Sequence, residues 1–241
     1  MTETIVVPAN ALEYIAYQRT GYLRLQNNIV LRLASRIVPG SRGRGHRKVR
    51  LESMLRGRGI RQRFSADMWS EYEELRDWLP ERVETVLDIG CGVAGIDVLL
   101  HRHYGAASSI TYSLLDKSSM NDTVFYGFEH KGAFYNSLEV ARSLLVQNGI
   151  APSQVRLIEA TADNRIDIDG TVDLVISLIS WGFHYPVGVY LERVHEILKP
   201  GGRLILDIRR DTSGVEELQG RFEAIKLISS TSKKERYLAI R

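Results

Sequence analysis

The fold of this chain is decided by Val86-Leu87-Asp88-Ile89-Gly90-Cys91-Gly92-Val93-Ala94-Gly95, an apolar run that ends in a glycine-rich turn. The run continues into Ile96-Asp97-Val98-Leu99-Leu100, so the predicted order is strand, tight turn and helix. Glycine permits positive φ angles and lets a ligand approach the backbone closely. The first amides of a helix have no partners inside the helix. The turn is therefore a candidate site for a ligand that carries an anionic group.

Strand and helix patterns alternate from Glu84 onward, as expected for a parallel α/β sheet. Strands are expected at 85–89, 110–115, 155–159, 172–179 and 203–208, and helices at 94–104, 137–148, 187–198 and 215–219. Residues 222–228 and 235–240 are expected to form an antiparallel hairpin at the sheet edge. We predict an α/β fold: a doubly wound, mostly parallel seven-stranded sheet with an antiparallel C-terminal hairpin and a helical N-terminal extension. An aromatic-rich insertion at 117–136 and loops at 180–186 and 199–202 complete this part.

The N-terminal part is basic. Residues 1–63 contain 13 Lys and Arg against 3 Asp and Glu, whereas residues 64–241 carry a net charge of −7. One helix kinked near Gly21 is expected over 9–38, then a basic, glycine-rich connection over 42–50 and a short helix over 49–55. Ser65 is expected to cap a helix that ends at Leu79. We interpret 1–63 as a basic helical extension and 64–241 as the ligand-binding domain.

Composition narrows the class of protein. The single cysteine, Cys91, cannot form an internal disulfide, and no apolar run approaches the roughly 20 residues that span a bilayer. We therefore expect a cytoplasmic protein without a transmembrane segment. With six histidines and no paired-cysteine spacing, no metal site is predicted. The oligomeric state is not indicated.

The glycine motif alone is compatible with nicotinamide, flavin and S-adenosylmethionine. Three further features decide between them: Asp88 lies two residues before Gly90, Lys199-Pro200-Gly201-Gly202 precedes the fifth strand, and the chain closes with a hairpin. In this order of motifs, residues 84–241 resemble the class I S-adenosylmethionine-dependent methyltransferases. Ala94 is a departure, since members of that family often have glycine there.

The resemblance implies a set of cofactor-binding residues. Gly90, Gly92 and Gly95, with Cys91 in the same turn, would line the methionine part, and Asp88 would hold its amino group. Asp116 would bind the ribose. Asp163 would contact the adenine amino group beside the backbone of Ala162, and Ser177 to Trp181 would lie beneath the sulfonium. Lys117 would lie against the adenine, a placement that the adjacent insertion puts in doubt.

His184 and Tyr185 are the catalytic candidates. His184 follows the fourth strand at the carboxyl edge of the sheet, where a base for an oxygen or nitrogen acceptor is needed. The alternative is a loop histidine satisfied by the backbone. Tyr185 and Trp181 would wall the acceptor pocket or pack the loop.

The sequence is compatible with four functions. The first is methylation of a small molecule whose acceptor is covered by the extension 1–63. Because this extension is rich in arginine, the acceptor is expected to be anionic, such as a nucleotide-linked or polymer-end sugar. The second is methylation of RNA, held by the basic stretch from Arg42 to Arg63. The third is a non-catalytic binding protein with the same fold, and the fourth is a dehydrogenase.

Overall fold

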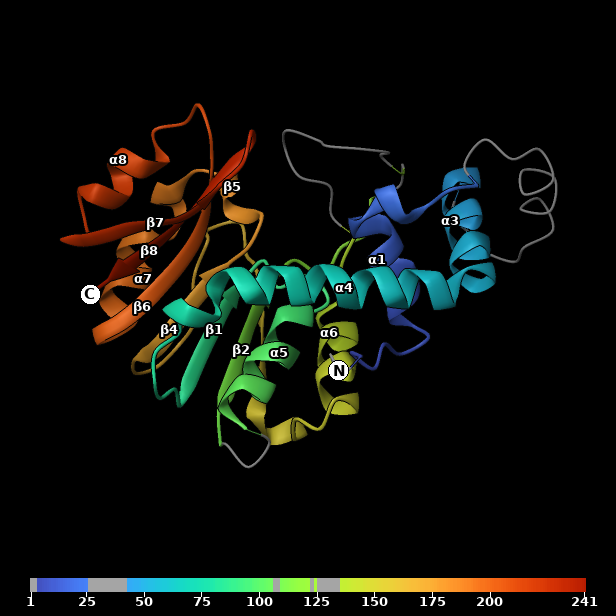
Figure 1. Ribbon diagram of the computed structural model, residues 1–241, viewed down its shortest axis with the longest axis horizontal. Coiled ribbons are helices and arrows are strands. Elements are labelled where there is room, and N and C mark those ends of the chain that lie inside the picture. The colour runs from blue at the N-terminus through green and yellow to red at the C-terminus, as the bar shows by residue number, and fades with distance from the viewer. Residues whose placement is uncertain (1–3, 26–42, 106–108, 122–123, 125–134) are drawn as a thin grey trace.

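Seven strands form one sheet in the computed structural model, which describes residues 4–25, 43–105, 109–121, 124 and 135–241 (Figure 1). The sheet order is β3-β2-β1-β4-β6-β8-β7, and all neighbours are parallel except that β8 is antiparallel to β6 and β7. The predicted mostly parallel sheet with its C-terminal hairpin is confirmed. The strands are β1 (Thr85–Ile89), β2 (Thr111–Asp116), β3 (Val155–Glu159), β4 (Val172–Ser177), β6 (Leu198–Arg209), β7 (Ala224–Ser230) and β8 (Lys234–Ile240).

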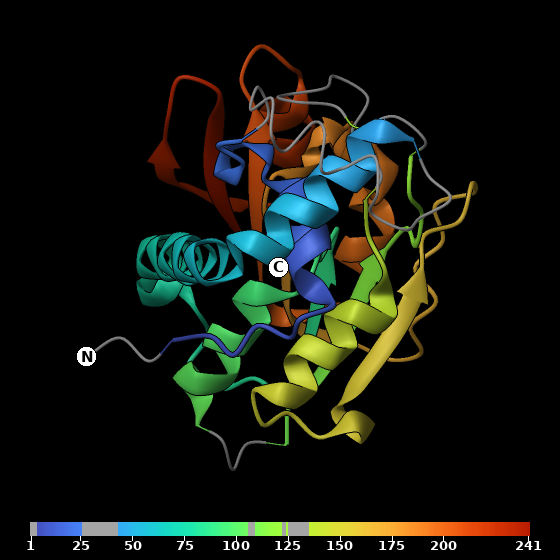
Figure 2. The same ribbon diagram turned by 90° about the vertical axis from the view of Figure 1, so that its right-hand side faces the viewer.

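Helices cover both faces of the sheet (Figures 1 and 2). Helices α4, α5 and α6 lie on one face together with α1, and α7 and α8 lie on the other. No helix in the described ranges is long and apolar enough to cross a membrane. The helices are α1 (Ala11–Gln18), α3 (Arg44–Leu55), α4 (Gly57–Leu75), α5 (Gly95–Tyr104), α6 (Leu138–Gln147), α7 (Leu191–Ile197) and α8 (Gly214–Gln219), with 3-10 turns η1 (Thr20–Tyr22), η2 (Arg76–Trp78), η3 (Pro152–Gln154) and η4 (Val187–Val189).

The central strands are apolar on both faces because each face has its own core. Side chains of successive strand residues point to opposite faces. In β4, Leu174 and Ile176 join the core under α4, α5 and α6, whereas Val175 between them joins the core under α7. This burial explains the almost continuous apolar run that predicts the strand.

The strand order reverses between β1 and β4, and the glycine-rich turn follows β1 at that point. Ile89 is in register with Leu115 at the end of β2, and Asp88 is in register with Ile176 near the end of β4. The turn, Asp116 and the segment after β4 are thereby brought to one edge of the sheet. In open α/β sheets this edge, at such a reversal, is where ligands bind.

The N-terminal helices differ from the prediction. Helix α1 ends at Gln18 instead of continuing, because Arg19 leaves helical geometry (φ −128°, ψ 64°) and turns toward Asp67 of α4. The rest of the predicted helix, from residue 26, lies outside the described residues. Helix α3 begins at Arg44, inside the stretch predicted to be a connection.

Helix α4 begins at Gly57, well before the predicted cap at Ser65, which lies buried inside the helix. At its first residue, Gly57, the absence of a side chain allows a close contact with Leu12 of α1. The proposed division between residues 63 and 64 falls within this helix.

Two further segments are corrected near the sheet. Residues 180–185, expected to be a loop, form β5 (Ser180–Tyr185), which is not a member of the seven-stranded sheet. The predicted turn at 199–202 is part of β6. The pairing of β6 with β4 is irregular there, because Val172 pairs with Leu198 but Leu174 pairs with Arg203. Most of the predicted insertion at 117–136 lies outside the described residues.

Two acids are buried together beneath the glycine turn. Asp97 in the first turn of α5 is fully buried, and Asp88 on β1 is nearly so. Burial raises the pKa of Asp97 to about 7. Burial and the neighbouring charge of Asp97 raise the pKa of Asp88. Two carboxyl groups that share a dry site do not ionise together readily.

The contribution of Asp97 to stability should therefore fall as the pH rises from about 4 to about 7. Over this range the unfolded Asp97 ionises while the folded one still holds its proton, so the unfolded state is favoured. The Asp97→Asn variant has no carboxyl group to ionise at this position. We expect the difference in melting temperature, variant minus wild type, to be several degrees larger at pH 8 than at pH 5. Asp169→Asn, at an exposed position, is the control. An equal difference at both pH values would contradict the prediction.

Candidate functional site

The glycine-rich turn is held by the end of the neighbouring strand. The amides of Gly90 and Cys91 donate to the carbonyl of Leu115 (2.7 and 3.4 Å), and the amide of Gly92 donates to Asp116 Oδ2 (2.8 Å). The Ala94 amide donates to the Cys91 carbonyl (2.8 Å). These four amides are thus used within the protein. They are not the free donors that an anion would need.

The turn is crowded by three other segments. Gly90 has φ +74°, and a Cβ there would lie 1.8 Å from the hydroxyl oxygen of Ser180. A Cβ at Gly92 would lie 2.9 Å from Gln18 Oε1 at the end of α1, and one at Gly95 would lie 2.4 Å from the Phe64 ring on α4. Packing therefore excludes a Cβ at Gly90 and Gly95, whereas at Gly92 glycine is favoured by the positive φ of +55°. Ala94 also adopts a left-handed conformation (φ 59°).

Two cavities of about 310 and 300 Å³ open on either side of the turn. Both are lined by Gly90, Asp116, Ser180 and Tyr185, so they meet at these residues. The first, here called the turn cavity, lies between the glycine turn and helices α1 and α4. The second, called the strand-end cavity, lies over the ends of β2 and β3. The turn cavity is lined by the predicted site residues Asp88, Gly90, Cys91, Gly92, Gly95, Asp116, His184 and Tyr185.

Most of the other predicted residues line the strand-end cavity: Lys117, Ala162 and Trp181. Two residues line neither cavity. Asp163 is largely exposed and faces Arg165 at 3.9 Å, while its neighbour Asn164 lines the cavity. Ser177 is fully buried, where its hydroxyl donates to the Ile89 carbonyl (2.7 Å) and accepts from the Trp181 amide (3.0 Å).

Trp181 packs into the core beside its cavity. Its side chain is fully buried, and Nε1 donates to the Val187 carbonyl (2.8 Å). Ser177 and Trp181 together hold β5 against the end of β1. In this structure their side chains support the cavity wall.

Helices α1 and α4 supply lining residues that the sequence reasoning missed. Gln18 and Arg19 come from the end of α1, and Phe64, Met68 and Glu71 come from one face of α4. Phe64, Met68 and Glu71 are four and three residues apart, a spacing typical of one helix face. A helix predicted to start at Ser65 leaves Phe64 out of this pattern. The N-terminal extension thus forms a wall of the turn cavity.

Asp116 lies where the two cavities meet. Burial raises the pKa of its carboxyl group to about 6, although the amides of Gly92 and Lys117 donate to it and lower the pKa. Its Oδ1 accepts from the Lys117 amide at 2.7 Å. A carboxylate held in this way is oriented and available near neutral pH.

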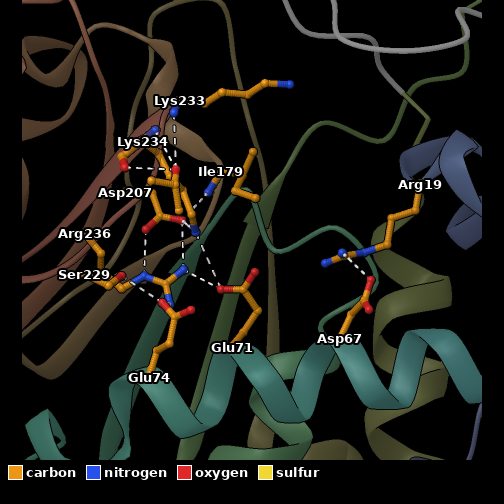
Figure 3. A network of polar contacts seen from close by, with 11 residues as sticks. Arg19, Asp67, Glu71, Glu74, Ile179, Asp207, Ser229, Lys233, Lys234 and Arg236 are labelled. Atoms are coloured by element: carbon orange, nitrogen blue, oxygen red, sulfur yellow. Dashed lines mark hydrogen bonds and ion pairs between the residues drawn. The ribbon is translucent and has the colours of Figure 1, made fainter.

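A buried ion-pair network fixes the far wall of the turn cavity (Figure 3). Arg236 on β8 is fully buried and donates to both carboxylate oxygens of Asp207 on β6, at 2.7 and 3.0 Å. It also donates to Glu71 (2.5 Å) and Glu74 (3.2 Å) on α4. Lys234 adds a further contact to Asp207 at 2.6 Å.

This network reaches the segment that follows β4. The amide of Ile179, which has φ +55°, donates to Asp207 Oδ2 (3.2 Å). A branched residue with a positive φ is strained and is kept only where surrounding contacts fix it. Asp207 therefore positions Ile179 and, next to it, Ser180, which covers Gly90.

Within the described part of the chain, no group of three His, Cys, Asp or Glu is arranged to hold a metal ion. The site is instead built from backbone, carboxylates and aromatic side chains. His184 packs edge-on to Phe183, with ring centroids 5.2 Å apart. Tyr185 separates the two cavities, and burial followed by the charge of Asp116 raises its pKa.

Comparison with known proteins identifies similar folds. No protein-family model and no curated protein matches the amino-acid sequence. A solved precorrin-6y C5,15-methyltransferase from Geobacter metallireducens GS-15 is similar over 73% of this chain and 87% of that chain, with 17% identity and a TM-score of 0.50. A candidate O-methyltransferase from Nostoc punctiforme PCC 73102 is similar over 96% of this chain and 72% of that chain, with 15% identity and a TM-score of 0.52. At these identities the likeness concerns the fold.

The contact between Gly90 and Ser180 can be tested by stability. Gly90→Ala combines a positive φ with a steric clash, so it should lower the free energy of unfolding by about 2–5 kcal/mol. Gly149→Ala has a similar φ (+96°) but open space, and should cost only about 1 kcal/mol. Urea denaturation measures both.

The second variant, Ser180→Gly in the Gly90→Ala background, should recover the part of the loss that the clash causes. If Gly90→Ala and Gly149→Ala cost the same, the close approach of Ser180 has no energetic role.

Proposed function

We propose that this chain, which has the fold of the class I S-adenosylmethionine-dependent methyltransferases, binds S-adenosylmethionine and transfers its methyl group to a small acceptor. The observation that carries the proposal is the pair of cavities that meet at Gly90 and Asp116. They lie at the carboxyl edge of the sheet, where the strand order reverses.

The residues present fit the cofactor. In our proposal the nucleoside half occupies the strand-end cavity, with Ala162 and Asn164 beside the adenine. Asp116, at the junction, accepts hydrogen bonds from the ribose. Asp88 in the turn cavity holds the ammonium group, and the glycine turn borders the methionine chain.

The chemistry requires little from the protein beyond orientation. When bound, the sulfonium supplies an electrophilic methyl group. The chain must then hold a nucleophile in line with it, which is a proximity effect. Ile179 and Ser180, fixed by Asp207, would form the surface against which the acceptor is placed. His184 is proposed as the base and Tyr185 as a wall or hydrogen-bond donor. Unchanged methyl transfer by His184→Ala would remove His184 from this role.

The part of the turn cavity left for an acceptor is small and mixed in character. Phe64 and Met68 give it an apolar side, and Glu71 gives it a carboxylate that is already paired with Arg236. This supports an acceptor of small-molecule size with a hydroxyl or amino nucleophile. An anionic acceptor needs positively charged partners, and Arg19 is the one guanidinium or ammonium group among the described residues that line this cavity. That the acceptor is anionic therefore stays a prediction. A cytoplasmic location stays a prediction too.

A second candidate is an RNA methyltransferase. Helices α3 and α4 carry the exposed basic side chains Arg50, Arg58 and Arg63, within the stretch predicted to hold a phosphate backbone. Exposed arginines at the rim of a small-acceptor site would also produce this pattern, so the two functions need a direct test.

Titration calorimetry with S-adenosylhomocysteine tests the proposed cofactor. We expect binding to the wild type, and about tenfold weaker binding to Asp116→Asn because one charged acceptor is lost. Affinity should also fall as the pH drops from about 7 to about 5, because the carboxyl group of Asp116, with a pKa of about 6, then gains a proton.

Asp169→Asn again serves as the exposed control. Absence of binding by the wild type would favour a non-catalytic protein with this fold, and binding of NADH in its place would favour a dehydrogenase.

Salt dependence tests the RNA candidate. If Arg50, Arg58 and Arg63 hold RNA phosphates, the affinity for a structured RNA should fall steeply between 50 and 200 mM salt, about tenfold or more, and the triple Gln variant should show a shallower slope. A filter-binding titration measures this. Lack of RNA binding at low salt leaves the small-molecule acceptor as the better function.

A further inference from the structure

We propose, on the premise of the function above, that Arg19 binds the carboxylate of the cofactor's methionine moiety. The site is formed by the end of α1 in the N-terminal extension, outside the part of the chain that carries the glycine motif. It gives this extension a role in cofactor binding in addition to covering the acceptor.

The first argument is that the glycine turn itself has few donors to offer. The amides of Gly90, Cys91, Gly92 and Ala94 all donate to protein oxygens. The side-chain amide of Gln18, which lies over Gly92, donates to the Tyr135 carbonyl (3.0 Å) and to Asn136 Oδ1 (3.2 Å). These groups are therefore not available to a carboxylate beside the turn, and a charged donor nearby would add to what the turn can offer.

The second argument is the balance of charge around the turn cavity. Its described lining contains the carboxyl groups of Asp88, Asp116 and Glu71, of which Glu71 is already paired with Arg236 and Asp88 has a pKa raised by burial. The carboxylate of Asp116 favours an ammonium group and repels a carboxylate. Arg19 is the single guanidinium in that lining, so it matches the carboxylate of an amino-acid moiety, while the carboxyl side of the cavity matches the ammonium group.

The third argument is the position and freedom of the guanidinium. Arg19 follows Gln18, whose amide oxygen would lie 2.9 Å from a Cβ on Gly92, so both residues stand beside the turn. Arg19 Nη1 lies 3.3 Å from Asp67 Oδ2, and the two side chains are 31% and 43% exposed (Figure 3). A pair this exposed and this long is weak. The guanidinium has several N–H donors, so it can bind a carboxylate while Asp67 orients it.

Two nucleosides separate this role from a structural one. S-adenosylhomocysteine carries the amino-acid end, whereas 5′-methylthioadenosine lacks it. Calorimetry with Arg19→Gln should show an affinity for S-adenosylhomocysteine lowered about 10- to 100-fold and an affinity for 5′-methylthioadenosine changed less than about threefold. Arg19→Lys, which keeps the charge, should lose less. Arg24→Gln, an exposed arginine of the same extension that lines neither cavity, is the matched control.

Three results would overturn the proposal. Equal losses for both nucleosides in Arg19→Gln would mean that Arg19 only supports the fold. Unchanged affinity for both would mean that Arg19 does not contact the cofactor. Failure of the wild-type protein to bind either nucleoside would remove the proposed function itself, a result distinct from the other two.

Discussion

The site depends on how the glycine-rich turn is fastened to the end of β2. Three consecutive amides, from Gly90 to Gly92, donate to the Leu115 carbonyl and to the Asp116 carboxylate. Because β1 and β2 are parallel neighbours, this clamp follows directly from their register. It orients Asp116 toward the junction of two cavities and at the same time uses three amides of the turn. These three amides are therefore not available to an anionic ligand.

The remaining walls come from segments that lie far from the turn in sequence. Helix α4 places Phe64 against Gly95 and Glu71 against Arg236, so one rigid element borders the cavity along its length. On the opposite side, Asp207 holds the Ile179 amide and so keeps Ser180 over Gly90. Burying Arg236 is tolerable because Asp207, Glu71 and Glu74 surround it. Such a network is costly to disturb and keeps the cavity in one shape.

The sheet could be predicted from the sequence because its signals are local. Apolar runs such as 172–177, bounded by turn residues, predict buried strands, and the helices between them carry their own periodicity. The candidate residues at strand ends, Asp88, Asp116, His184 and Tyr185, followed from that placement and line the cavities. Asp163 and Ser177 did not, because the direction of a side chain after a strand is set by contacts with residues such as Arg165 and Trp181.

The N-terminal part was harder to predict for the same reason. Glycines at 57 and 59 weaken the local helical signal, and only packing of Ile60 and Phe64 in the core makes the helix continuous. Arg19 leaves helical geometry to meet Asp67, a contact between residues far apart in the chain. No periodicity in the sequence encodes either event. The lining supplied by α1 and α4 is therefore visible only in three dimensions.

The ion pair between Glu71 and Arg236 joins residues 165 positions apart, and Arg236 lies near the start of β8. During synthesis, β8 leaves the ribosome after the other described strands. The glycine turn and its clamp to β2 can form while the chain is still growing, but Glu71 and Asp207 have no counter-charge until β8 pairs with β6. Contacts of such long sequence separation form slowly. The wall that depends on Arg236 therefore needs contacts between distant parts of the chain, whereas the clamp of the glycine turn joins residues that lie close in sequence.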